Sequence, residues 1–146
     1  MYAPRNVGGL VTNRTLLRPQ ASAVAAAFSL IGLALDRESF LSALIKLTAG
    51  AVTGAPSAQQ VSWKVQDSAD GATFADILPS QANPVVVGAD ITAVNGNSVL
   101  EIDCSGLRRF IRVVATVAFT GGTAPTIFLS SEATLGGGKL LPTVHV

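Results

Sequence analysis

The chain contains one cysteine, Cys104, and one histidine, His145, which is the penultimate residue. A single cysteine excludes an intrachain disulfide framework. One residue of each kind is too few for a zinc site of the usual type within one chain, and a Ser/His/Asp triad would depend on a histidine in a terminal tail. We therefore expect no cofactor and no enzymatic activity.

Charge is also scarce, because only 13% of the 146 residues are charged, whereas about 25% is usual for a soluble domain. The net charge is +1, so the chain has no global field to hold a phosphate backbone, and we expect no nucleic-acid partner. Hydrophobic residues make up 49% and the mean hydropathy is +0.48, which excludes a disordered chain. We expect one domain with a surface that a partner partly covers.

The longest apolar run covers residues 21–35 and reads ASAVAAAFSLIGLAL. It is shorter than the stretch of about 18 residues that a membrane-spanning helix needs. No small-x-small cleavage site follows it, so it does not fit a signal peptide. We expect one or two buried strands here and no association with a membrane.

Alternation of apolar and polar residues dominates the rest of the chain and predicts strands. The strand candidates are residues 39–49, 61–68, 72–77, 85–87, 91–94, 98–104, 108–120 and 126–135. Asp70-Gly71, Asn95-Gly96 and Gly121-Gly122 give turn signals between them. The pattern predicts an all-β chain, folded as an antiparallel, jelly-roll-like β-sandwich over residues 21–137. Its expected core is Trp63, Val65, Leu100, Ile102, Ile111, Val113, Val117, Ile127 and Leu129.

Both ends of the chain lack such alternation. Residues 1–20 are predicted to form an extended N-terminal arm, and residues 138–146 a short C-terminal tail. The arm carries Leu10, Val11, Leu16 and Leu17, which make it too apolar for a solvated tail. We expect it to lie on another surface, its own or a partner's, and to be mobile in the isolated protein.

The charged residues offer few candidate sites. Asp67, Asp70, Asp76 and Asp90 fit a hairpin turn better than a calcium site, because their order differs from that of an EF-hand loop. Glu101 and Asp103 share one strand face, which favours a solvated face over paired catalytic carboxylates.

Arg108, Phe110 and Arg112 lie on one face of the longest strand candidate and are interface candidates. Two alternatives remain open for this face. Arg108 and Arg112 pair with Glu101 or Asp103 on a neighbouring strand, or the face is covered by the second sheet or by the arm.

Two stretches resemble a family of small structural proteins encoded by tailed bacteriophages and prophages. The first is GAVTGAPS, from residue 50, with a D-G-x-x-F hairpin at residues 70–74. The second is the strand pair RFIRVVATVAFTGGTAP, at residues 109–125. The resemblance covers about residues 36–137 and implies a virion protein, either a capsid decoration protein or another minor head protein. It supplies no catalytic residues.

The expected function is therefore that of a capsid decoration, or cement, protein that binds the outside of the head and stabilises it. The expected partners are the major capsid protein and further copies of the chain, as a homotrimer. The expected location is the surface of the phage head, and the host cytoplasm during assembly. The alternatives are a head–tail connector or tail structural protein, and a carbohydrate-binding β-sandwich module or adhesin.

Overall fold

The computed structural model describes residues 10–22, 27–78 and 86–138, which form ten β-strands and no helix. One sheet has four strands, in the order β1 (Thr12–Ala21), β10 (Thr126–Gly138), β4 (Phe40–Thr53) and β8 (Asn97–Asp103). The other has six strands. Its main path is β2 (Ala27–Ile31), β9 (Phe110–Thr120), β5 (Ala58–Ser68) and β6 (Ala75–Asp76), while β3 (Leu35–Asp36) pairs with β9 and β7 (Val87–Ile91) pairs with β5.

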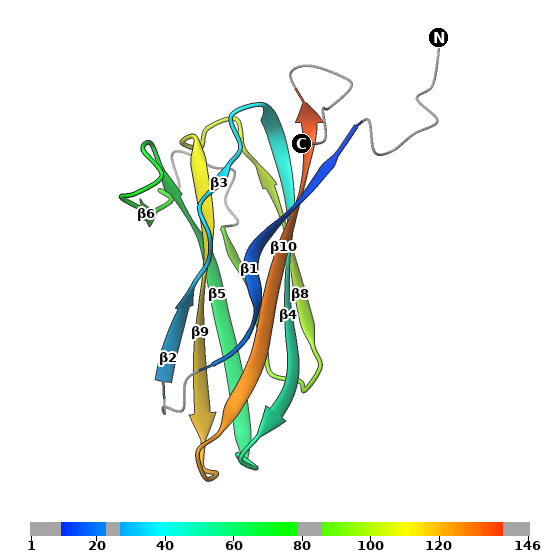
Figure 1. Ribbon diagram of the computed structural model, residues 1–146, viewed down its shortest axis with the longest axis vertical. Helices are drawn as coiled ribbons and strands as arrows, with labels where there is room; N and C mark the ends of the chain where they lie inside the picture. The colour runs from blue at the N-terminus through cyan, green and yellow to red at the C-terminus, as the bar shows by residue number, and fades with distance from the viewer. Residues whose placement is uncertain (1–9, 23–26, 79–85, 139–146) are drawn as a thin grey trace.

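The two sheets face each other as a sandwich, and every strand pairing is antiparallel (Figure 1). The long strands pair first with last, β1 with β10 and β2 with β9, and then inward, β4 with β8 and β5 with β7. This nested order is that of a jelly roll. The expected all-β, jelly-roll-like sandwich is confirmed.

The core lies between the sheets and follows the alternation of the sequence. On β9, Ile111, Val113, Ala115 and Val117 are fully buried, whereas the residues between them point away from the core. All nine residues expected in the core are buried, with Trp63 the largest of them. Because side chains alternate between the faces of a strand, the pattern alone was enough to identify the inner face.

The prediction that residues 1–20 form an extended N-terminal arm is wrong from residue 12 onward. Residues Thr12–Ala21 form β1, an edge strand of the four-stranded sheet that pairs with β10. Leu16 and Leu17 are 0% and 2% exposed, so they belong to the core of this chain and are not available to a partner. Leu10 and Val11, just before β1, are half-buried, while residues 1–9 lie outside the described part of the chain.

Two β-bulges explain why β1 escaped notice in the sequence. The register against β10 shifts between Thr15 and Leu17 and again between Leu17 and Gln20. A bulge adds a residue to one strand, so that consecutive side chains no longer alternate between the faces. It lets the adjacent Leu16 and Leu17 both reach the core, which removes the period of two that marks a strand. The expected domain boundary at residue 21 is therefore moved to residue 12.

Two loops that cross between the sheets pack against each other at one end of the sandwich (Figure 1). One links β4 to β5 through Gly54, and the other links β9 to β10 through Gly121 and Gly122. The Thr123 N–H donates to the Gly54 carbonyl at 2.8 Å, and a Cβ on Gly122 would come within 2.6 Å of that same oxygen. The two stretches that carry the family resemblance thus meet here, at a contact that joins the sheets.

The other turn signals have different outcomes. Asp70 anchors the turn between β5 and β6, because its Oδ1 accepts the N–H groups of Ala72 and Thr73 at 2.9 and 2.8 Å. These bonds hold the pKa of Asp70 well below its usual value. The turn at Asn95 joins β7 to β8, which belong to different sheets, so it is not a tight hairpin.

Candidate interaction surfaces

Strand β9 presents the predicted interface residues on the outer face of the six-stranded sheet. Phe110, Arg112 and Val114 are half-buried and point away from the core, so the second sheet does not cover them. The sequence-based alternative that the second sheet encloses this face is therefore wrong. Strand β1 of the predicted arm pairs with β10 in the other sheet, and residues 1–9 of that arm lie outside the described part of the chain. Whether this face is open for binding depends on the partners of its polar side chains.

Arg112 is held within its own chain. Its Nε and Nη2 both donate to Oε1 of Gln66 on β5, at 3.0 and 2.7 Å. The guanidinium carbon lies 4.2 Å from the centre of the Phe74 ring, which is a favourable cation–π distance. Two of the five N–H donors of this side chain and one face of its guanidinium are thus engaged within the chain.

Arg108 and Arg109 are also bound within the chain. Asp67, which is fully buried, accepts the backbone N–H of Arg108 at 2.9 Å, and the two side chains approach to 3.8 Å. Arg109 donates to Asp36 at 2.6 Å and lies 3.2 Å from Glu38. The bond from Arg109 lowers the pKa of Asp36.

The alternative that Arg108 and Arg112 pair with Glu101 or Asp103 is wrong. Both carboxylates belong to β8, which is a strand of the opposite sheet. Further charges on the six-stranded sheet are matched as well: Lys64 bonds Asp76 at 2.7 Å, and Gln60 bonds Asp90 at 2.6 Å. The polar groups on the outer face of this sheet are thus largely satisfied inside the chain.

The outer face of the four-stranded sheet differs in this respect. On β10, β4 and β8 it exposes Leu44, Val99 and Phe128, whose exposed fractions are 41%, 50% and 51%. Strand register places Glu132 of β10, Lys46 of β4 and Val99 of β8 side by side in one row. Within the described part of the chain, the charged groups of Lys46, Glu101 and Glu132 form no ion pair or hydrogen bond.

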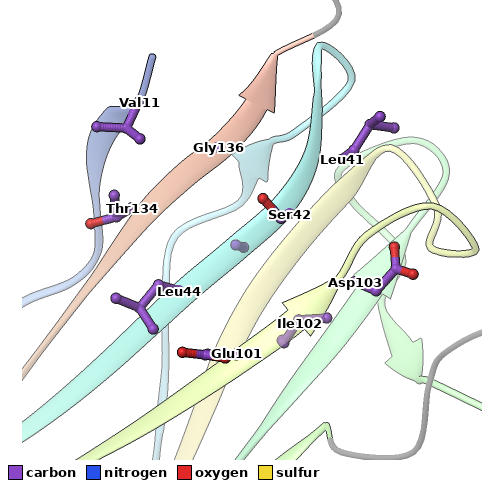
Figure 2. Close-up of a pocket in the computed structure, with 10 residues that line it drawn as sticks. Val11, Leu41, Ser42, Leu44, Glu101, Ile102, Asp103, Thr134 and Gly136 are labelled. Atoms are coloured by element: carbon purple, nitrogen blue, oxygen red, sulfur yellow. The ribbon is translucent and has the colours of Figure 1, made fainter. Parts of the chain in front are cut away.

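A groove of about 550 Å³ opens on this face, at the end of the sandwich opposite the crossing loops (Figure 2). Apolar side chains of Val11, Leu41 and Leu44 line it, together with the carboxylates of Glu101 and Asp103 on β8. The Ser105 N–H donates to Asp103 at 2.9 Å, which lowers the pKa of that carboxyl. The groove therefore combines an apolar lining with two acidic side chains.

The sequence missed most of this surface. Alternation over residues 39–49 predicts that Leu41 shares the inner face with Ala43, Ile45 and Leu47. The structure corrects this, because Leu41 is 44% exposed at the start of β4. Leu44 and Phe128 do stand at outward positions of their strands, and this was the available signal. It was not used because single exposed apolar residues are common on protein surfaces.

The single cysteine, Cys104, is fully buried. Burial raises the pKa of the Cys104 thiol to about 11, so it stays protonated at neutral pH. Among the described residues, no three His, Cys, Asp or Glu side chains gather closely enough to hold a metal ion. His145 and the tail at residues 139–146 lie outside the described part. The described residues contain no helix that is long and apolar enough to cross a membrane.

No protein-family model matches the chain, and no curated protein sequence matches it. Solved structures do. A chain in the structure of infectious bursal disease virus Gx strain superposes with a TM-score of 0.56 and 14% identity, over 90% of this chain and 34% of that one. The Gt strain of the same virus gives a TM-score of 0.51 and 12% identity, over 92% and 34%.

The SPBc2 prophage-derived protein YomS gives a TM-score of 0.45 and 12% identity, over 86% of this chain and 91% of that one. The identities to the bursal disease virus chains are low, so the likeness to them shows the fold alone. The chain thus has a β-sandwich architecture that also occurs in a virus structure, where it spans about a third of a longer chain.

Proposed function

We propose that the protein is a structural component of a bacteriophage virion, a capsid decoration protein that binds the outside of the head and stabilises it. The sequence resemblance over residues 36–137 supports the virion assignment, and the fold shared with the bursal disease virus chains is compatible with it. The proposed partners are the major capsid protein and further copies of the chain, and the proposed role is binding without catalysis or a cofactor.

One observation carries the proposal: the four-stranded sheet exposes Leu44, Val99 and Phe128 among charges that have no partner in the described part of the chain. Leu44 is the register partner of Glu101, and an exposed apolar side chain beside a charged group without a partner suits the binding of another protein. Of the two arginines that were predicted to bind a partner, Arg112 is hydrogen-bonded to Gln66 and Arg108 lies 3.8 Å from Asp67. A decoration protein needs a face of this kind to bind the capsid.

Stabilisation of the head follows from mass action. A protein that binds only the assembled lattice lowers the free energy of the assembled state by an amount that grows with its concentration relative to Kd. A homotrimer would match the local threefold positions of an icosahedral lattice, and we propose this oligomeric state. Light scattering on the purified protein tests it, because a stable monomer at tens of micromolar contradicts a trimer.

The test is deletion of the gene from the phage or prophage that encodes it, followed by purification of heads. We expect heads that assemble but lose DNA or break at a lower temperature, and that recover when the purified protein is added. Its copy number on normal heads should be in the hundreds. About a dozen copies at one vertex would instead identify a head–tail connector, and absence from purified particles would overturn the proposal.

A further inference from the structure

We infer that the outer face of β10, β4 and β8 in the four-stranded sheet is the surface that docks on the shell, and that it receives a protein surface carrying Arg or Lys beside apolar side chains. The inference rests on the proposed function, because it names the face and the chemistry of that contact. It differs from the sequence-based expectation, which placed the contact on the outer face of β9.

Charge matching distinguishes the two sheets. On the six-stranded sheet, Lys64 is paired with Asp76, and Arg109 with Asp36 and Glu38. On the four-stranded sheet, Glu101 and Glu132 have no cation within ion-pair distance in the described chain. A carboxylate that is already paired gains little from a new cation, whereas an unpaired one gains a charge-assisted hydrogen bond.

The same charges select the partner. The outer face of β10, β4 and β8 carries three carboxylates, on Glu101, Asp103 and Glu132, and one ammonium group, on Lys46. The cations of β1, Arg14 and Arg18, belong to the opposite edge of the sheet from β8 and are not counted in this face. If two copies met through this face, carboxylates would outnumber cations in the contact, which disfavours self-association. Phosphates of nucleic acid or of an anionic lipid surface are disfavoured for the same reason. A basic and apolar protein surface is complementary to it.

The groove gives this contact a shape (Figure 2). Leu41 and Leu44 offer an apolar surface for an aliphatic or aromatic side chain, while Glu101 and Asp103 stand on the β8 side of the groove. Strand β8 is an edge of its sheet in the described structure, where it pairs only with β4. A partner can therefore reach both carboxylates without displacing a strand of this chain.

The experiment measures binding of purified protein to heads from the deletion phage. Leu44→Asp and Glu101→Lys should each raise Kd about tenfold or more, because they place a charge on the apolar lining or reverse one of the carboxylates. Val87→Asp and Asp90→Lys are matched controls on the six-stranded sheet, and both residues are exposed. The controls should bind like the unaltered protein, and all four variants should keep its circular dichroism spectrum.

Binding of the unaltered protein should also weaken as salt is raised, because the contact is partly ionic. Equal binding by all variants, or loss only in Val87→Asp and Asp90→Lys, would overturn the inference while leaving the proposed function intact. Conversion of an oligomer to a monomer by Leu44→Asp, with unchanged binding to heads, would assign the face to a second copy and overturn it too. Failure of the unaltered protein to bind heads would contradict the proposed function itself.

Discussion

The indole ring of Trp63 occupies the space that a side chain on Gly88 would need. The two residues are register partners on β5 and β7, and a Cβ built on Gly88 would overlap the five-membered part of the ring. The Trp63 Nε1–H donates to the carbonyl of the next residue, Ala89, at 3.2 Å. Strand β7 thus crosses directly over the ring. Gly88 lies within this strand, whereas the sequence pattern had placed it between two short strands, at residues 85–87 and 91–94.

Gly88→Ala should therefore destabilise the protein. The added methyl group displaces either the indole or β7, and overpacking of this kind costs about 1–3 kcal/mol. Denaturant unfolding followed by tryptophan fluorescence measures both the stability and the environment of the only tryptophan. Gly136→Ala is the control, because its Cβ would meet the hydroxyl of Ser42 at 3.2 Å and Cγ1 of Val11 at 3.8 Å, and it should change stability far less. Equal effects of the two substitutions would contradict the packing described here.

Val113→Asp should abolish soluble expression. Val113 is fully buried between the sheets, and an unpaired carboxylate there costs several kcal/mol, a large part of a domain's stability. The neighbouring Val114 points outward and is half-buried, so Val114→Asp should still give folded protein. A soluble Val113→Asp variant with an unchanged melting temperature would mean that the faces of β9 are reversed.

Leu16→Ala should cost about 2–5 kcal/mol, the usual price of emptying a fully buried leucine site. Thr15→Ala, one residue earlier and exposed, should be nearly neutral. Thermal unfolding of both variants gives the comparison. If Leu16→Ala were as stable as the control, β1 would be a dispensable arm, as the sequence pattern had indicated.

Gly54→Ala should weaken the end of the sandwich where the two crossing loops meet. Gly54 has φ of +77°, and its Cβ would lie 2.5 Å from the Thr123 carbonyl. Gly121 also has positive φ, at +67°, but its Cβ would meet only the Ser57 hydroxyl, at 3.3 Å. Gly121→Ala should thus lower the free energy of unfolding only by the backbone strain, roughly 1–2 kcal/mol. Gly54→Ala should lower it by more, as measured by chemical unfolding. Equal losses would mean that the loops do not press together.

Stability should fall on acidification below about pH 4. The folded-state pKa of Asp70 lies below the value of 3.8 expected for the unfolded chain, because backbone N–H groups of Thr73 and Ala72 bond its carboxylate. Such a group stabilises the fold fully above the unfolded pKa, and the contribution is lost as pH falls toward the folded one. Asp70→Asn keeps an acceptor oxygen but does not titrate, so its melting temperature should fall less between pH 6 and about pH 3. An unchanged pH dependence would argue against this role for Asp70.

The sequence was informative wherever one strand face is buried without interruption. The alternation at Ile111, Val113 and Val117 was sufficient to locate β9 and its inner face. It failed at Leu16 and Leu17, because a bulge leaves no periodic trace. It also could not pair strands that are distant along the chain, so Arg108 was matched with the wrong carboxylates. Asp67, its observed partner, is 41 residues away and on a different strand.

The candidate interaction surface was less accessible to such reasoning. An exposed Leu44 has meaning only when it is known which charges beside it lack partners, and that depends on the order of strands in the sheet. Glu101 was identified as exposed from the sequence alone, but its position beside Leu44 follows from the pairing of β4 with β8.

The irregular course of β1 also bears on how the protein can be stored in a cell before it is used. A straight, open edge strand would be a template on which other copies of the chain could add without limit. Here the edge carries two bulges, Pro19, which has no N–H to donate, and the charged Arg18. These features interrupt the row of donors and acceptors that a growing fibril would copy. This edge is thereby protected from polymerisation.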